Sequence, residues 1–193
     1  PSFWMAWLFL VAISSFESVI LFWAGPLVER QAAVPLEEAA LVFSAFLAGM
    51  VVSRFGLSLP AVGRLEPTWL IRAGLVGVLT GAISAWISTS FALGVAAFFV
   101  AGFGSGVLFP LGIALAMDAA PAQPQLASSR LVLGPGLGLL IMPLVLGVLA
   151  DAADVSVAWV IVPLICVVAM ALTIPVARDR RAMSRVLADS SEA

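Results

Sequence analysis

The residue with the clearest chemical potential is Glu17, a carboxylate inside a long apolar run near the start of the chain. A carboxylate in hydrocarbon is costly unless it is protonated, paired or hydrated, so intramembrane carboxylates usually mark proton or solute pathways. Ser14 and Ser18 share one helical stripe with Glu17 and Leu21. This stripe predicts a wet cavity in which Glu17 binds a proton or contacts a solute. The alternative is a protonated structural carboxyl bonded to a neighbouring backbone group.

Arg54 is the second candidate for chemistry. A rise of about 1.5 Å per residue, counted from the outer end of its apolar segment, places it about 9 Å in depth from Glu17. A long arginine side chain closes much of that gap, which permits an ion pair with Glu17 or contact with an anionic group of a solute. The competing interpretation is an arginine whose side chain reaches back to the cytoplasmic interface.

The run GFGSG, residues 102–106, contains Ser105 but does not predict a nucleotide loop or a catalytic serine. It lies inside an apolar segment, lacks the GxGxxG spacing, and the chain contains no His to activate a serine. Ser105 therefore stays a candidate polar group on the solute or proton pathway. The absence of His and the single Cys166 also argue against a metal site, a cofactor or any catalytic residue, so we predict that the chain is not an enzyme.

Glycines and prolines form a third group. Glycine pairs spaced four residues apart let helices approach closely; they are Gly77 and Gly81, Gly102 and Gly106, and Gly134 and Gly138. Prolines inside apolar segments interrupt helical hydrogen bonding; they are Pro110, Pro135, Pro143 and Pro163. Each proline predicts either a bend that takes part in a conformational change or a static kink in a packed bundle.

The elements that must position these residues are membrane-spanning helices. The chain has 193 residues, of which 63% are hydrophobic and 10% charged, and its mean hydropathy is +1.17. At about 20 residues per crossing this is enough for about six spans, and backbone groups in hydrocarbon must be satisfied by helices. We expect an all-α membrane domain over 1–177 and a cytoplasmic tail over 178–193. The expected spans are 3–27, 38–62, 68–87, 91–117, 126–150 and 155–177.

The arginines predict the orientation. With six spans, eight of the nine arginines fall on the side of the two termini and only Arg30 falls on the other. The excess of positive charge places both termini in the cytoplasm, in a cell (cytoplasmic or inner) membrane. The six tryptophans fall near span ends, where an indole N–H can meet water. A net charge of -2 without a basic stripe argues against nucleic acid as a partner.

Three regions resemble a known family. The stretch VGRLEPTWLIR, residues 62–72, is similar to the cytoplasmic signature of major facilitator superfamily transporters, with Gly63, Arg64 and Arg72 in the motif. A second register, GMVVSRFG over residues 49–56, also fits; we prefer the first because it leaves a full-length second span. The runs GFGSGVLFPLGIALAMDAAP and RLVLGPGLGLLIMPLVLGVLADAADVSVAW resemble the fourth and fifth spans of the carboxy-terminal half of such a transporter.

The resemblance implies a six-helix half made of 3+3 inverted repeats, with solute bound between two halves. It implies that the first and fourth spans line the cavity, the second and fifth contact the other half, and the third and sixth face lipid. The expected function is secondary transport of a small solute by alternating access, with Glu17 as the candidate for proton coupling or solute contact. The cavity-facing groups of this half are few and mostly Ser, which favours a largely apolar or amphiphilic solute.

The expected partners are the lipid bilayer, the solute, and an amino-terminal six-helix half in the same chain or a second copy. The chain begins at Pro1 without an initiator Met, and we expect a fragment of a longer protein. The alternative is a self-contained six-helix module that binds a solute or partner without transporting alone. Six further spans before Pro1 would indicate the transporter half, and a start codon there would indicate the self-contained module.

Overall fold

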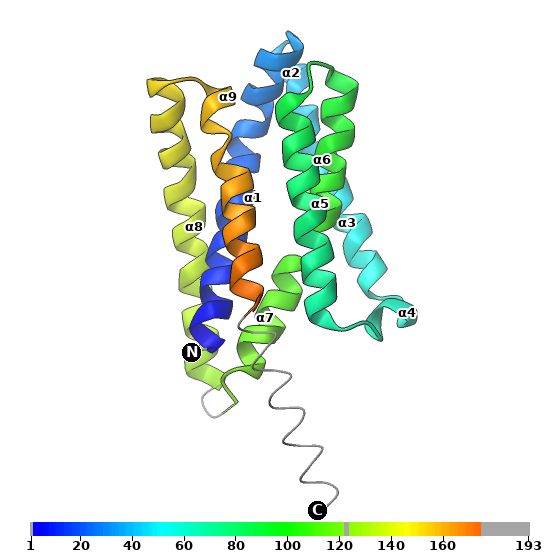
Figure 1. The fold of residues 1–193 in the computed structure, drawn as a ribbon, viewed down its shortest axis with the longest axis vertical. Helices are drawn as coiled ribbons and strands as arrows, with labels where there is room; N and C mark the ends of the chain where they lie inside the picture. The colour runs from blue at the N-terminus through cyan, green and yellow to red at the C-terminus, as the bar shows by residue number, and fades with distance from the viewer. Residues whose placement is uncertain (1, 122–123, 175–193) are drawn as a thin grey trace, which may run out of the picture.

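The computed structural model describes residues 2–121 and 124–174, and these residues contain six helical spans long and apolar enough to cross a membrane (Figure 1). The spans are Ser2–Ala32, Leu36–Leu57, Pro67–Ile87, Phe91–Asp118, Pro124–Ala152 and Val155–Ile174. The described residues contain no strand. The expected all-α, six-span fold class is confirmed. The expected tail, 178–193, and the last three residues of the expected sixth span lie outside the described residues.

Several spans are divided into shorter helices. The elements in chain order are α1 (Ser2–Ala32), α2 (Leu36–Ala39), α3 (Leu41–Leu57), α4 (Pro60–Gly63), α5 (Pro67–Ile87), α6 (Phe91–Ser105), α7 (Leu108–Asp118), α8 (Pro124–Ala152) and α9 (Val155–Ala158). The second span thus consists of α2 and α3, and the fourth of α6 and α7. The sixth begins with α9 and continues as a helix from residue 161.

The second span ends at Leu57 and not at residue 62 as the hydropathy suggested. Pro60 is the physical reason. A residue before proline is pushed out of the helical region, and Leu59 has an extended backbone with φ -72° and ψ 131°. Pro60 then begins α4, where its missing N–H costs nothing because the first turn of a helix has no acceptor for it.

Two spans are interrupted four residues before a proline. α6 ends at Ser105 and α7 begins at Leu108; Pro110, in the next turn, has no N–H to donate to the Gly106 carbonyl. In the sixth span Pro163 has no N–H to donate to the Trp159 carbonyl, and the backbone N–H of Val162 donates to that carbonyl at 3.0 Å instead. Pro135 and Pro143 lie inside α8 without ending it.

The pairing of the spans follows an inverted repeat. The first span packs on the fifth through α1 and α8, and the second packs on the fourth through α3 and α6. If the first, second and third spans are matched to the fourth, fifth and sixth, the contact of the first span with the fifth corresponds to the contact of the fourth with the second. The contact of the third span with the fourth, between α5 and α6, likewise corresponds to that of the sixth with the first, between α9 and α1. In Figure 1 the blue α1 lies centrally, with α8 on one side and α5 and α6 on the other.

Glycines allow the two equivalent interfaces to close. In the contact of α3 with α6, a Cβ on Gly49 would lie 2.7 Å from the Phe103 amide nitrogen, and one on Gly102 would collide with the Phe46 backbone. In the contact of α1 with α8, a Cβ on Gly138 would lie 2.8 Å from the Val11 carbonyl oxygen. Backbone therefore approaches backbone in both interfaces, as small residues permit in membranes.

The tryptophans divide into two groups. Trp4 and Trp69 are exposed, and Trp7 donates its indole N–H to the Arg130 carbonyl at 2.8 Å. Trp159 does not meet the expectation of a wet indole at a membrane edge: it is fully buried and donates to the Ala82 carbonyl at 3.2 Å. Its ring packs edge-on against Phe98, so burial in the helix packing replaces exposure to water.

Candidate functional site

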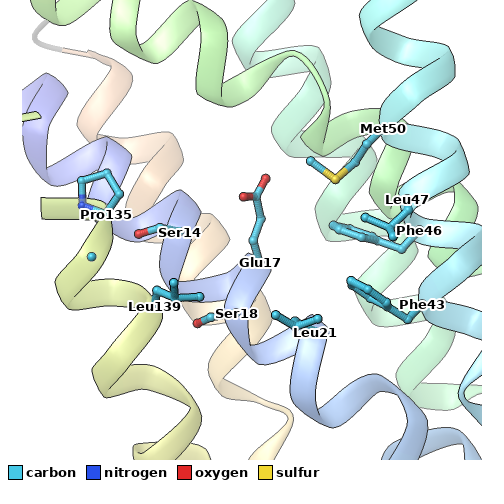
Figure 2. A pocket seen from close by; sticks show the side chains of 11 residues that line it. Ser14, Glu17, Ser18, Leu21, Phe43, Phe46, Leu47, Met50, Pro135 and Leu139 are labelled. Carbon is cyan, nitrogen blue, oxygen red and sulfur yellow. The ribbon is translucent and has the colours of Figure 1, made fainter. Parts of the chain in front are cut away.

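A cavity of about 340 Å³ lies between α1, α3 and α8, the first, second and fifth spans. Figure 2 shows Glu17 projecting into it, with Ser14, Ser18, Pro135 and Leu139 toward one side and Phe43, Phe46, Leu47 and Met50 toward the other. Leu21 and Gly136 complete the lining. The four residues of the predicted stripe on α1 therefore line one cavity.

Glu17 is half-buried and is held by the fourth span. The hydroxyl of Ser105, which has no exposed surface, donates a hydrogen bond to Oε1 of Glu17 across 88 residues of sequence. Ser105 is the last residue of α6, immediately before the interruption of the fourth span. The carboxyl thus has a hydroxyl partner at the end of a helix and an open side toward the cavity, where it can exchange a proton or bind a donor group.

Ser14 and Ser18 direct their hydroxyl groups away from Glu17. Ser14 Oγ donates to the Val11 carbonyl at 2.9 Å. Ser18 Oγ donates to the Ser15 carbonyl at 2.8 Å and lies 3.3 Å from the Gly138 carbonyl of α8. Their protons are committed to backbone acceptors, so these serines offer a solute only an oxygen lone pair.

Arg54 and Glu17 form no direct ion pair in the described residues. Instead, Nε of Arg54 donates to the Gly106 carbonyl at 3.4 Å, next to the Ser105 that holds Glu17. Arg54 and Glu17 are thus bonded to two consecutive residues of the fourth span, which keeps the two opposite charges in one region. The expected pairing is therefore replaced by an indirect link through the interrupted fourth span.

The opposite wall is apolar, and residue-by-residue reasoning for chemistry missed it. Phe43 and Phe46 stack with ring centroids 6.3 Å apart and an interplanar angle of 19°. Phe43, Phe46, Leu47 and Met50 follow the three- and four-residue spacing of one helix face. That periodicity was a signal in the sequence, because residues at this spacing share one side of a helix.

The motif-like residues lie away from the cavity. Gly63 ends α4, and a Cβ placed on it would meet nothing within 4 Å. Arg64 and Arg72 are exposed at the same end of the bundle. None of the three lines the cavity.

Some of the glycines and prolines singled out for helix packing and kinks line the cavity, and the others lie in the helix contacts around it. Pro135 lines the cavity, while Gly134 and Gly138 lie against α1 through Trp7 and Val11. Gly102 and Gly106 lie against α3, where a Cβ on Gly106 would be 2.6 Å from the Met50 carbonyl oxygen. Pro110 follows the interruption that carries Ser105 and Gly106.

The other cavities and polar groups of the described chain are weaker candidates for a functional site. A larger groove of about 560 Å³ between α5 and α6 is lined by hydroxyl and apolar side chains and by no charged residue. No group of three His, Cys, Asp or Glu residues within 2–121 and 124–174 could hold a metal ion. Cys166 is a buried free thiol. The cavity around Glu17 is therefore the best candidate site.

Comparisons with known proteins match the chain and its fold. The family model of the Major Facilitator Superfamily matches residues 6–191. Among solved structures, the crystal structure of a Major Facilitator Superfamily transporter, FucP, in the outward conformation matches with a TM-score of 0.76 at 16% sequence identity. The match covers 90% of this chain and 42% of that one, so the chain spans less than half the length of FucP. No curated protein matches the chain.

Proposed function

The chain belongs to the Major Facilitator Superfamily, and we propose that it forms the carboxy-terminal six-helix half of a secondary transporter that moves a small solute by alternating access. The observation that carries the proposal is Glu17, a carboxyl in the middle of the first span that faces a cavity and is held by the fourth. Membership of this transporter family confirms the expectation that the chain is not an enzyme.

The role of a half is supported by the surfaces beside the cavity. α3 and α8 flank it, and both expose large apolar side chains, among them Val51 and Phe55 on α3 and Leu140 and Leu144 on α8. A second six-helix half placed on these two helices would close the cavity from the open side. The solute then binds between the halves, as inverted-repeat transporters bind theirs near the midplane.

Proton coupling is assigned to Glu17. When Glu17 is ionised, it accepts the hydrogen bond of Ser105 and interacts with the charge of Arg54. When it takes up a proton from the cavity, the site loses one negative charge, and its interactions with Arg54 and a bound solute change. That difference in free energy between the two protonation states is what can drive one conformation over another.

The solute class follows from the lining. Phe43, Phe46, Leu47, Met50 and Leu139 provide apolar contact, and Glu17 provides the polar contact from this half. A largely apolar or amphiphilic molecule matches such a wall. We place the protein in the cell membrane with both termini in the cytoplasm. Arg64 lies in the connection between the second and third spans and Arg72 near the start of the third, and Arg130 lies near the start of the fifth span, where its carbonyl accepts from Trp7. In a six-span chain these positions fall on the side of the termini, and an excess of arginine marks the cytoplasmic side.

The test uses the complete protein in proteoliposomes loaded with the pH dye pyranine. Four probes are added in turn: a neutral sugar, an amino acid, a dicarboxylate and the amphiphilic cation ethidium. At least one probe is expected to change the internal pH, and Glu17→Gln is expected to insert normally but abolish that change. Glu29→Gln is the matched control, because Glu29 lies on the same helix, is exposed, and does not line the cavity. Equal proton movement in wild type and Glu17→Gln would remove Glu17 from the mechanism.

A further inference from the structure

The interruption of the fourth span leaves a backbone acceptor inside the membrane. In a continuous helix the N–H of residue 110 would donate to the Gly106 carbonyl, but Pro110 has no N–H. An unsatisfied carbonyl in hydrocarbon is as costly as a lost hydrogen bond in an apolar medium, because no water is there to replace the missing donor. The freed carbonyl therefore requires another donor.

Arg54 provides that donor from the second span. Its Nε lies 3.4 Å from the Gly106 carbonyl oxygen. Close packing of α3 places it there, because a Cβ on Gly106 would lie 2.9 Å from Cβ of Ser53. Because Gly106 has no side chain, α3 can approach closely, and this approach brings Arg54 of α3 to the Gly106 carbonyl.

The neighbouring residue holds the opposite charge. Ser105, one position before Gly106, donates its hydroxyl proton to Glu17 of α1. Two consecutive residues at one helix interruption therefore hold the two charged groups of this region. Of the charged side chains on the elements packed against α1, Arg54 on α3 lies at this interruption, bonded to the residue next to the one that holds Glu17. Arg130 on α8 lies near the amino-terminal end of α1, where its carbonyl accepts from Trp7, and Asp154 lies at the other end, paired with Arg30.

We propose that Pro110 makes the interruption of the fourth span a positioning element, in which the freed Gly106 carbonyl fixes Arg54 at the distance that sets its effect on Glu17. This inference rests on the proposed function, because it explains how the proton site is tuned. Pro110 and Gly106 are positioning residues that act through Arg54. On protonation of Glu17, Arg54 loses its counter-charge, and the attraction between the first and second spans at this point is lost while the bond from Arg54 to Gly106 remains.

The test titrates Glu17 without any solute. Infrared difference spectra of the complete protein in lipid bilayers are recorded against pH, and the carboxyl band that Glu17→Gln removes is followed. In Pro110→Ala the new N–H donates to the Gly106 carbonyl and displaces Arg54, whose side chain then reaches toward the interface. Because a nearby positive charge favours the ionised carboxyl, the midpoint is expected to move to higher pH by about one unit. Arg54→Gln is expected to move it in the same direction, and the double variant no further than Arg54→Gln alone.

Pro163→Ala is the matched control. It restores an N–H at the corresponding interruption of the sixth span, where the Trp159 carbonyl accepts from the Val162 N–H and, within the described residues, from no arginine. It is expected to leave the midpoint unchanged. If Pro110→Ala fails to insert into the membrane, the test uses Pro110→Gly instead, because glycine restores the same backbone N–H.

The outcomes separate the two proposals. An unshifted midpoint in the Pro110 variant, or shifts of Pro110→Ala and Arg54→Gln that simply add, would overturn the positioning of Arg54 while leaving proton coupling in place. A carboxyl band that does not depend on Glu17 at any pH would overturn the proton role on which the inference rests.

Discussion

Nη2 of Arg30 lies 2.6 Å from Oδ2 of Asp154, so the end of the first span is paired with the turn that begins the sixth. Beside this ion pair, Gln31 donates its side-chain N–H to the Trp86 carbonyl, and the Trp86 indole N–H donates to the Ser156 carbonyl at 2.6 Å. The first, third and sixth spans are thus tied together at one end of the bundle. The opposite end of the first span is tied instead to the fifth, through Trp7 and Arg130.

The tie at Asp154 predicts a dependence of stability on pH. The backbone N–H of Ser156, which donates to Asp154 at 2.8 Å, and the charge of Arg30 lower the pKa of Asp154 below its ordinary value. The carboxylate therefore stabilises the fold above the pKa of Asp in the unfolded chain, about 3.9, and this contribution is lost as pH falls through the lower folded value.

Asp154→Ala should therefore lower the thermal unfolding temperature near neutral pH and lower it less in acid. Tryptophan fluorescence during heating, at several pH values between about 6 and about 3, measures the difference. Asp151→Ala, at the end of α8, is the control at the same end of the bundle. A difference between wild type and Asp154→Ala that stays constant over this range would contradict the assignment.

Ser105→Ala tests the bond between the fourth and first spans. The hydroxyl of Ser105 is fully buried and donates to Glu17, so its removal should cost about 1 kcal/mol of unfolding free energy, as interhelical hydrogen bonds in membranes do. Unfolding in mixed detergent micelles measures the change. Ser129→Ala removes an exposed hydroxyl bonded only to Leu126 of its own helix and should change little. Equal effects of the two substitutions would argue against the link to Glu17.

Gly49→Ala tests the close approach of α3 and α6. A Cβ on Gly49 would lie 2.7 Å from the Phe103 amide nitrogen, and backbone atoms cannot move aside cheaply, so a loss of about 1–3 kcal/mol is expected. Gly56→Ala, on the same helix, meets nothing within 4 Å and should be neutral or slightly stabilising because alanine favours helix. The same detergent unfolding assay compares them, and a stable Gly49→Ala variant would show that the spans can separate.

The size of the native protein tests the proposal of a half transporter. An antibody raised against residues 178–193 should detect a band near twice the 20.0 kDa of this chain in source membranes. A band near the mass of the chain itself would indicate a self-contained module and would move the question to homodimerisation or to a separate partner.

The cavity wall shows how far sequence reasoning reached into the site. Glu17 could be found from its residue type alone, since a carboxylate in an apolar run is rare for energetic reasons. Phe43, Phe46 and Met50 could be found only as a helix face, because apolar residues in a membrane span face lipid, protein and solute alike. The partners of Ser14 and Ser18 could not be found, because a hydroxyl can donate to its own helix or to a neighbour, and packing selects between them.

The sequence by itself determined the six spans, the helical class and the intramembrane charges, because the bilayer demands apolar segments of a set length and penalises every exception. It also marked Pro110 as one of four intramembrane prolines that each remove a helical hydrogen bond, but the structure decided that the fourth span is interrupted before Pro110 while α8 continues through Pro135 and Pro143. Only the tertiary structure decided that the freed carbonyl meets Arg54, that Ser105 holds Glu17, and that Trp159 is buried. These contacts join residues that are far apart in the chain, and their geometry depends on how closely glycines let the helices approach, which no local pattern encodes.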